Sequence, residues 1–594
     1  MTITPDLFGA FLKCPTKCWL RAAQEPASGN AYAEWVKSQN EAYRAAETER
    51  LLSETAKDES VVSPTTENLK TAQWRLAVRL IGRTQEKDCD LETQIQAVER
   101  VPSEGRGKPA KFIPICFIFT NKLDKDDKLM LGFDAFVISQ MLGREAGLGK
   151  IIHGDDHATI KVKTSASAGE VRERLGEITA LLASPTPPDL ILNRHCVECE
   201  FQASCRKLAV EKDDLSLLAG MSAKERQKLR SKGIFTVNQL SYTFRPHRRP
   251  KLMREKKEKY HHALKALAIR EKKIHIAGSP EVKIEGTPVY LDVEGLPDRD
   301  FYYLIGVRIG NGDSAVQHSL WADTVEDEGK IWRKFLAILE TVEKPVLIHY
   351  GSYETEFLAT LNKRYGSKVQ DQPDRAAKLS TLNLVSQLFG EIYFPTLSNG
   401  LKDIGAWLGF SWAETSPVGV NSLVCRYEWE RTRNPSLEAR LTAYNVEDCQ
   451  AAERVTQAII RLHASGPNAA SPDESHDAVH VKSLKRPQRR WGMFVSPFKE
   501  LEEINAAASW DYQRDRIYVK SAKAVKRAPK VSGREQIKWW KRFPAKRVIF
   551  IPDQESCPFC GGGCEVICRC NRILYDLSFG RTSVKRWIAS TTFH

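Results

Sequence analysis

The clearest hydrophobic and polar pattern in the chain is the alternation in VYLDVEG, residues 289–295. The apolar residues of this segment would share one face of a strand, whereas Asp292 and Glu294 would share the other face. Because successive side chains of a strand point to opposite faces, the two carboxylates are directed into one small volume. Like charges in that position repel one another unless a positive charge lies between them. The pattern therefore predicts a core strand that carries a candidate cation site.

Apolar runs of strand length alternate with segments of helical periodicity from about residue 284 to residue 463. The predicted strands cover residues 289–295, 301–309 and 345–350, and the predicted helices cover residues 325–341, 353–364 and 437–463. Such alternation is typical of a mixed α/β domain. At 594 residues the chain is too long for one core, so we expect an α/β multidomain protein. The predicted domains span residues 1–210, 211–275, 276–463, 464–550 and 551–594.

The second predicted domain has the pattern of a helical hairpin, similar to a helix-hairpin-helix. Ser222 and Thr236 are suited to cap two short helices, and Gly233 provides a left-handed break between them. A basic helix is predicted to follow at about residues 250–272. Residues 464–480 are rich in Gly, Pro, Ser and Asp, which is typical of a linker.

The formal net charge of +14 indicates a class of partner, because the positive excess is concentrated at residues 244–273 and 482–547. Clustered Lys and Arg bind polyanions through the release of counterions, so nucleic acid is the predicted partner. A solvated helix face is the alternative interpretation of either cluster taken alone. The predicted nucleic-acid-binding residues are Arg248, Arg249, Lys251, Arg254, Lys256 and Lys257.

The apolar segments do not indicate a membrane span. The most apolar run, FIPICFIF at residues 112–119, is far shorter than the ~20 residues that cross a bilayer. We therefore expect a cytoplasmic protein without a membrane partner. In a reducing compartment the 14 cysteines are expected as thiols or metal ligands rather than disulfides. The sequence contains no Gly-x4-Gly-Lys-Ser/Thr loop, which argues against an ATPase.

Two further acids are predicted near the ends of the strands. Ser352 is a suitable N-cap for the helix after strand 345–350, which places Glu354 in the first helical turn. Tyr444 and Asp448 are spaced i and i+4 on the apolar face of a later helix. An aspartate on such a face costs several kcal/mol unless it is paired or binds a cation.

Together with Asp292 and Glu294, these acids can converge on two Mg²⁺ or Mn²⁺ ions. One ion would activate a water molecule, and the other would stabilise the leaving 3′ oxygen of a phosphodiester. Tyr444, one turn before Asp448, would orient the attacking water.

The order of these motifs resembles that of a known family. Asp-x-Glu on a strand, an aromatic and acid pair after a later strand, and Tyr-x3-Asp on a late helix are similar to the tyrosine-containing DEDD 3′-to-5′ exonucleases, which have an RNase H-like fold. The wider run YLDVEG, FYYLIGV, HYGSYE, YFPTLSNGLKDIG and YNVEDC resembles the RNase H-like domain of the RecB-like nuclease family, over about residues 284–457.

This resemblance implies a metal-dependent 3′-to-5′ exonuclease in which Asp292, Glu294 and Asp448 hold Mg²⁺ or Mn²⁺. Glu354 would complete the site, although the family usually has Asp at this position, and Tyr444 would be the water-orienting residue. We expect DNA rather than RNA as the substrate. The alternative is a catalytically inert nucleic-acid-binding accessory protein, linked to mobile elements or DNA repair.

Cysteines mark both ends of the first predicted domain. Cys196, Cys199 and Cys205 have the spacing Cys-x2-Cys-x5-Cys, and Cys14 lies far upstream. This bracket resembles the 4Fe-4S staple of RecB-like nucleases, which implies an iron-sulfur cluster held by these four thiolates; Cys18 is an extra cysteine. Zinc and free thiols are the alternatives, since thiolates suit either metal.

Staples of this kind enclose a PD-(D/E)XK nuclease, which needs an acid and then acid-x-Lys on the next strand. Here Thr120, Asn121 and Lys122 occupy the expected acid-x-Lys position, and the upstream strand offers Glu99 without a clear aspartate. The sequence therefore predicts a degenerate PD-(D/E)XK-like domain that serves as a DNA-binding scaffold. A third interpretation keeps this domain as the active nuclease, with Lys122 essential.

Cys557 and Cys560, in CPFCGGG, have the shape of a zinc knuckle. With the following YDLSFGRTSVKRW they resemble the zinc ribbon of insertion-sequence transposases. A second Cys-x2-Cys pair is missing, and Cys564, Cys568 and Cys570 are irregularly spaced. A partial, zinc-ribbon-like C-terminus that binds Zn²⁺ and one that binds no metal are both consistent with this pattern.

Overall fold

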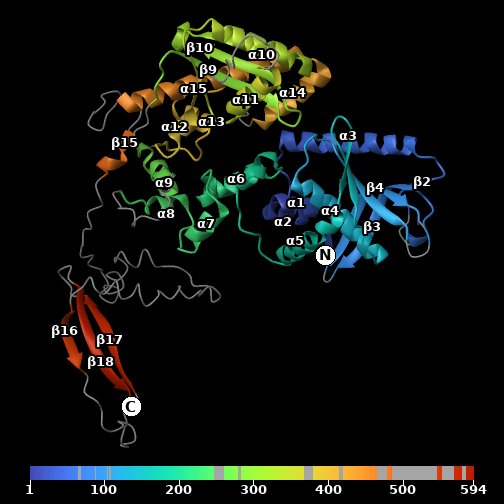
Figure 1. Ribbon diagram of the computed structural model, residues 1–594, viewed down its shortest axis with the longest axis horizontal. Helices are drawn as coiled ribbons and strands as arrows, with labels where there is room; N and C mark the ends of the chain where they lie inside the picture. Colours follow the sequence, from blue (N-terminus) through green and yellow to red (C-terminus); the bar gives the residue numbers. More distant parts are fainter. Residues whose placement is uncertain are drawn as a thin grey trace, which may run out of the picture. The chain divides into compact units, whose positions relative to one another are not determined.

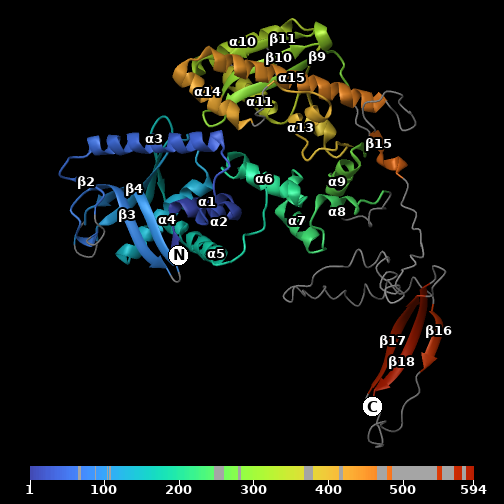
Figure 2. The same ribbon diagram turned by 180° about the vertical axis from the view of Figure 1, so that it is seen from behind.

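Figures 1 and 2 show the computed structural model of the chain from two sides. It describes residues 1–64, 69–86, 89–103, 105, 109–246, 260–278, 282–366, 379–413, 419–464 and 478–484, and the backbone of residues 545–550, 568–577 and 584–593. The chain divides into two compact units, Met1–Tyr518 and Val519–His594. The larger unit contains both helices and strands, which confirms the predicted mixed α/β class; the finer domain boundaries stay a prediction.

A seven-stranded sheet is the centre of the N-terminal part of the larger unit. Its strands follow the order β2-β3-β4-β5-β6-β7, and β1 pairs with β4. They are β1 (Thr2–Ile3), β2 (Ser60–Val62), β3 (Leu76–Glu86), β4 (Cys89–Val101), β5 (Lys111–Ile118), β6 (Gly149–His153) and β7 (Ala158–Val162).

Helices cover both faces of this sheet (Figure 1). On one face, α3 (Ala31–Glu54) packs through Tyr43, Leu51 and Leu52 against a cluster of strand residues. On the other face, α4 (Lys125–Leu142) packs against the sheet and against its neighbours, which are α1 (Pro5–Lys13) and α5 (Ala168–Leu182). The short α2 (Pro15–Ala22) follows α1 directly.

Four helices follow: α6 (Gln202–Glu211), α7 (Ala223–Arg230), α8 (Val237–Ser241) and α9 (His262–Glu271). The predicted caps are confirmed, because Ser222 accepts a hydrogen bond from Glu225 N and Thr236 accepts one from Gln239 N. Gly233 has a φ of 77°, the left-handed conformation that glycine adopts without strain. The first part of the predicted basic helix lies outside the described residues, and the described part begins at His262.

A second sheet of five strands has the order β11-β10-β9-β12-β13. β9, β10 and β11 are antiparallel neighbours, whereas β12 runs parallel to both β9 and β13. The strands are β9 (Thr287–Leu296), β10 (Phe301–Ile309), β11 (Val316–Trp321), β12 (Pro345–His349) and β13 (Ser380–Asn383). The parallel strands are connected through helices, as their geometry requires.

Each face of β9 is buried under different helices, which confirms the predicted alternation. Val289, Leu291 and Val293 join the core formed with α10 (Val325–Glu340) and α11 (Tyr353–Tyr365). On the opposite face, Tyr290 packs with residues of α15 (Pro435–Ala464). The three helices differ from their predicted ranges by no more than two residues at either end.

Shorter elements complete this part of the chain: α12 (Leu384–Leu388), α13 (Leu401–Trp407), α14 (Val420–Thr432), and a small sheet of β14 (Ile392–Tyr393), β8 (Ile274–Ile276) and β15 (Ala478–His480). Ser352 lies at the N-cap of α11, as predicted, but its side chain makes no capping hydrogen bond. Its backbone ψ of −14° is already helical there, rather than the extended conformation typical of a capping serine.

The described backbone of the smaller unit forms a three-stranded sheet. In it, β16 (Ala545–Phe550) runs parallel and β17 (Cys568–Leu577) antiparallel to β18 (Val584–Phe593). Cys557, Cys560 and Cys564 lie outside the described residues, so the zinc ribbon stays a prediction. The six predicted nucleic-acid-binding residues from Arg248 to Lys257 also lie outside them.

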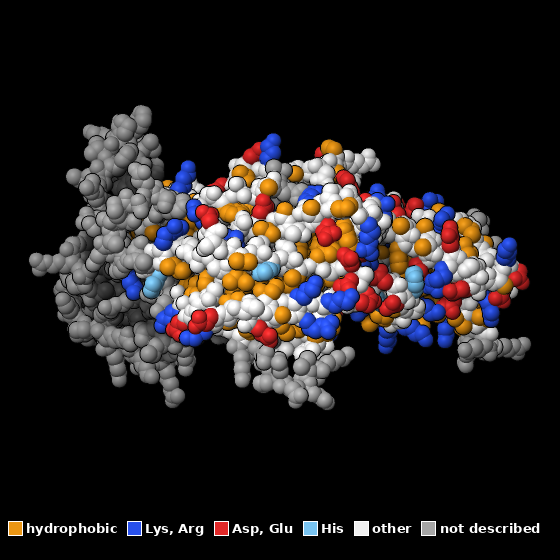
Figure 3. Space-filling view, turned by 90° about the horizontal axis from the view of Figure 1, so that it is seen from above, with side chains coloured by type: hydrophobic (Ala, Val, Ile, Leu, Met, Phe, Trp, Pro, Cys, Tyr) orange, Lys and Arg blue, Asp and Glu red, His pale blue; other side chains and the backbone are white. Residues whose placement is uncertain are grey.

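The described surface in Figure 3 carries acidic and basic side chains that are interspersed, with hydrophobic side chains between them. A face with mixed signs does not by itself attract a polyanion. None of the helices that the structure describes combines the length and the apolar character that a bilayer crossing requires.

Candidate metal centre

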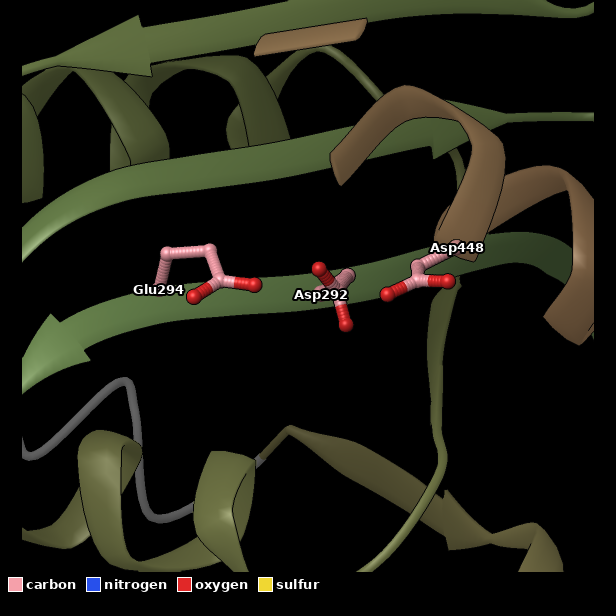
Figure 4. Close-up of side chains that lie close together, drawn as sticks. All are labelled: Asp292, Glu294 and Asp448. Carbon is pink, nitrogen blue, oxygen red and sulfur yellow. The ribbon is translucent and has the colours of Figure 1, made fainter. Parts of the chain in front are cut away.

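Three carboxylates from β9 and α15 meet between the sheet and the helix. Asp292 and Glu294 project from β9, and Asp448 reaches them from α15 (Figure 4). One oxygen from each carboxylate lies within 4.8 Å of the other two. Among the residues that the structure describes, this is the one such group of three or more His, Cys, Asp or Glu residues. All three acids were predicted from the sequence.

The geometry follows from how α15 packs on the sheet. Cys449, Ala452 and Val455 of α15 are buried in the core that also contains Tyr290 of β9. The period of the helix then directs Asp448 toward the same face of the strand, where Asp292 and Glu294 lie. Apolar packing therefore brings together acids that are more than 150 residues apart in sequence.

Each of the three carboxylates accepts a hydrogen bond from a neutral donor. Asn445 Nδ2 lies 2.7 Å from Asp292 Oδ2, Ser422 Oγ lies 2.9 Å from Glu294 Oε2, and Trp412 Nε1 lies 2.7 Å from Asp448 Oδ1. A neutral donor fixes the rotamer of a carboxylate without cancelling its charge. The acids are thus oriented by the protein and keep their affinity for a cation.

These three donors were not predicted from the sequence. A signal existed for Asn445, because it lies four residues after Leu441 on the inward face of α15 and is fully buried. Gly306 of β10 leaves the room that Asn445 occupies, since a Cβ at this glycine would lie 2.0 Å from Asn445 Oδ1. Ser422 and Trp412 come from segments whose position only the folded chain defines.

The electrostatics of the centre favour a bound cation. Burial, together with the charges of the neighbouring acids, holds the pKa of Asp292 well above its usual range. The same causes raise the pKa of Glu294 to about 7, partly offset by the Ser422 hydroxyl, and burial also raises the pKa of Asp448. Without a cation, the centre must therefore take up protons near neutral pH.

Glu354 lies at the edge of this centre. It is in the first turn of α11, as predicted, and only 5% of its surface is exposed. Its charge contributes to the raised pKa of both Asp292 and Glu294. Its Oε2 has no hydrogen-bond partner, and the imidazole Nδ1 of His349 lies 3.5 Å away. A buried carboxylate oxygen without a partner fits a site that takes a further cation.

Tyr444 lies one turn before Asp448, as the helical spacing predicted. Burial raises the pKa of Tyr444 far above its usual value, so the hydroxyl stays protonated. Hydrogen bonding to Tyr444 and Trp412 lowers the pKa of Asp448 in part. A protonated phenol beside the carboxylates is suited to orient a water molecule by hydrogen bonding.

A family model described as the RNase_H superfamily matches residues 289–460. No curated protein matches the chain. The match and the five-stranded sheet together define this segment as an RNase H-like domain, as the resemblance implied. Domains of this superfamily act on nucleic acid, commonly as nucleases that use divalent metals. The donor set fits that use, because carboxylate oxygens are the ligands that Mg²⁺ and Mn²⁺ prefer.

The structure also brings the four predicted cysteine ligands near one another. Cys14 precedes α2, Cys196 and Cys199 lie in a short turn, and Cys205 is in α6. Burial raises the pKa of Cys205 to about 11, and the charges of the other three contribute to that shift. Cys18 is instead buried in the apolar core between α1 and α4.

Polar contacts tie the two cysteine segments together. Glu200 accepts ion pairs from Lys17 Nζ at 2.9 Å and Arg21 Nη2 at 2.7 Å. Asn193 Nδ2 donates to the carbonyl oxygen of Lys13 at 3.2 Å. The segment that carries Cys14 and the segment that carries Cys196 and Cys199 are therefore adjacent.

Asn121 and Lys122, from the predicted acid-x-Lys position, contact acids of the turn between β9 and β10. The backbone amides of Asn121 and Lys122 each donate to the carboxylate of Asp298 at 2.9 Å, and Lys122 Nζ pairs with Asp300 at 2.6 Å. Glu99 pairs with Lys150 of β6. Lys122 is thus engaged by the turn between β9 and β10, and the degenerate PD-(D/E)XK-like site stays a prediction.

Proposed function

We propose that this protein is a metal-dependent nuclease whose RNase H-like domain removes nucleotides from the 3′ end of nucleic acid, with DNA as the preferred substrate. The observation that carries the proposal is the convergence of three carboxylates within 4.8 Å in this domain. Exonucleolytic polarity and the preference for DNA rest on the resemblance to the DEDD exonucleases.

In this proposal Asp292, Glu294 and Asp448 hold Mg²⁺ or Mn²⁺, and Glu354 completes the ligand set. The bound ions would supply positive charge at the attacking and leaving oxygens of the phosphodiester. Asn445, which donates to Asp292, holds that ligand in one orientation. Preorganised ligands lower the barrier because they need no rearrangement during the reaction.

The attacking water is oriented by Tyr444, whose hydroxyl retains its proton. Since Tyr444 and Asp448 are one turn apart on α15, the phenol and the ligand carboxylate approach the same water from one helix. The positive charge of the bound ions would ease the loss of a proton from that water to the solvent.

The test is cleavage of end-labelled single-stranded and duplex DNA and RNA with Mg²⁺ or Mn²⁺. We expect a ladder that shortens from the 3′ end, and its loss in the Asp292→Ala/Asp448→Ala variant. The matched control is Glu356→Ala, which removes an exposed acid from α11. Equal cutting by wild type and double variant would place the activity elsewhere. Nucleic-acid binding without any cutting would favour the inert accessory protein.

We also propose that Cys14, Cys196, Cys199 and Cys205 hold an iron-sulfur cluster rather than zinc. Three thiolates on one Zn²⁺ ion lie ~4 Å apart, given Zn–S bonds of ~2.3 Å. Among the described residues, no three of these sulfur atoms lie within 4.8 Å of one another, and a cluster of several irons separates its ligands more widely. Iron and sulfide analysis of anaerobically purified protein tests this, with Cys18→Ser as the control and Cys196→Ser as the variant expected to lose both.

The basic segment from Arg248 to Lys257 is proposed to deliver the nucleic acid by contacts with its backbone. Replacing Arg248, Arg249 and Lys251 with Ala is expected to weaken binding equally for unrelated sequences and to reduce its dependence on salt. Unchanged binding and unchanged salt dependence would remove this segment from the proposed function.

A further inference from the structure

A lysine that no part of the proposed mechanism uses lies beside the metal centre. Lys402 is the second residue of α13, and its Nζ lies 4.1 Å from the ring centroid of Tyr444. Its positive charge also lowers the pKa values of Glu294 and Asp448. One ammonium group is thus close to the water-orienting tyrosine and to carboxylates from both β9 and α15.

The residues that follow Lys402 in the chain pack against α15 and hold Lys402 in place. Ile404 and Leu408 are buried against α15 in the core that contains Cys449 and Val455. Gly405 allows Trp412 to lie close, since a Cβ there would be 2.7 Å from the indole ring. The same indole donates to Asp448, so Trp412 contacts both α13 and the carboxylate centre.

The segment that precedes Lys402 is anchored by hydrogen bonds from Lys265 and Tyr350. Lys265 of α9 is 1% exposed, and its Nζ donates to Thr396 Oγ1 at 3.1 Å and Asn399 Oδ1 at 2.8 Å. Tyr350, which follows β12, donates its hydroxyl to the Asn399 carbonyl oxygen at 2.5 Å. The backbone at Lys402 is therefore anchored on both sides, and the fold places its side chain over the ring of Tyr444.

The charge of the centre indicates what this ammonium group would bind. Two divalent cations against the four carboxylates of the proposed site leave no net charge to attract an anionic phosphodiester. Negative charge then increases on the phosphate as the water attacks, and a fixed cation beside it stabilises that state. Lys402 is the basic group whose charge already acts on both Glu294 and Asp448.

We propose that Lys402 binds a nonbridging oxygen of the phosphate that is cleaved and thereby places it against the carboxylates and Tyr444. This inference rests on the proposed nuclease function and extends it to recognition of the substrate. The alternative role of Lys402 is purely structural, as a counter-charge that packs on the Tyr444 ring.

The experiment compares wild type with Lys402→Met, which keeps an unbranched apolar chain over the ring, and with Lys402→Arg, which restores the charge. Lys334→Met is the control, because Lys334 is exposed on α10. Binding in Ca²⁺ is measured for two single-stranded oligonucleotides. One has an ordinary 3′-terminal phosphodiester, and the other has an uncharged methylphosphonate at that linkage. Mn²⁺ affinity is measured separately without nucleic acid.

We expect Lys402→Met to bind the ordinary oligonucleotide about 10-fold more weakly, the usual effect of losing a hydrogen bond to a charged group. Binding of the methylphosphonate oligonucleotide should change less than about 2-fold, because its linkage carries no charge for Lys402 to recognise. Lys402→Arg should recover most of the loss, and Mn²⁺ affinity should not fall. The cleavage rate of Lys402→Met should decrease about 100-fold.

The outcomes separate this inference from the proposed function. Cleavage and binding equal to wild type in Lys402→Met would overturn the inference and leave the nuclease intact. Equal weakening for both oligonucleotides, or a loss of Mn²⁺ affinity, would make Lys402 a structural residue. A charge-dependent loss of binding in a protein that does not cleave would support the phosphate contact and refute the nuclease. Binding of neither oligonucleotide by wild type would refute both.

Discussion

Asp292→Asn tests the electrostatics of the metal centre directly, because it removes one charge and keeps the shape of the side chain. The asparagine retains an oxygen that can accept the hydrogen bond from Asn445 Nδ2, which lies 2.7 Å from Asp292 Oδ2. Two unit charges within 4.8 Å of each other repel by at least about 3.5 kcal/mol at an effective dielectric constant of about 20. Water screens part of this repulsion at half-buried acids, so we expect the metal-free variant to gain about 1 to 2 kcal/mol in free energy of unfolding at neutral to mildly alkaline pH.

The gain depends on pH in a defined direction. In the folded protein, burial and the neighbouring charges raise the pKa of Glu294 from 4.5 to about 7. An acid with a raised folded-state pKa favours the folded state below its unfolded pKa, and that stability is lost as the pH rises through the folded pKa. The wild type should therefore lose stability between pH 4.5 and about 7, and the advantage of the variant should appear over the same window.

Mn²⁺ should reverse the order of the two proteins. A ligand present at 100 times its dissociation constant stabilises the folded state by about 2.7 kcal/mol, which the wild type gains and the variant largely loses. Hydrogen exchange of peptides from β9 and α15 is the suitable assay, because a chain of several domains has no single unfolding transition. Lower protection of the metal-free variant above neutral pH, or equal protection of both proteins by Mn²⁺, would show that repulsion among the acids does not govern the stability of the centre.

Three further predictions concern two donors to the centre and a buried arginine of α14. Trp412→Phe removes the donor to Asp448 and should weaken Mn²⁺ binding about 10-fold in calorimetry; unchanged affinity would show that the indole only fills space. Ser422→Ala removes a hydrogen bond that lowers the pKa of Glu294, so the pKa should rise further above about 7. Mn²⁺ titrations at a series of pH values should then show binding that begins at higher pH than in wild type. Arg426→Met removes a fully buried cation surrounded by aromatic rings and carbonyl acceptors. It should cost about 3 kcal/mol, seen as faster hydrogen exchange in α14, and an unchanged exchange rate there would contradict it.

The fold of residues 284–463 was largely predictable because its signals are local. A strand with one apolar face and a long helix with an apolar stripe each follow from spacing alone. The structure places the predicted strands and helices at nearly the same residues. The order β11-β10-β9-β12-β13 was not predictable in this way, because strand pairing depends on which distant segments bury each other's apolar surface.

The candidate site likewise contains some residues that the sequence identifies and others that only the folded chain brings together. Asp292 and Glu294 are recognisable because their spacing alone places them on one face, and Asp448 because it interrupts an apolar face. Trp412 and Ser422 carry no such signal, since an isolated Trp or Ser in a variable segment is common. Only the folded chain shows that they donate to Asp448 and Glu294. The four cysteines lie between these cases: their spacing is visible, while their approach to one another depends on the packing of α2 and α6.

The types of element, the acids of the centre and the class of chemistry they favour are therefore encoded locally in the sequence. Local periodicity and side-chain chemistry decide these, and both can be read from neighbouring residues. The tertiary structure decided which donors orient each carboxylate, where Glu354 lies, and that Lys402 faces Tyr444. Those relations join residues far apart in the chain, and only the burial of apolar surface on both faces of the sheet brings them within contact distance.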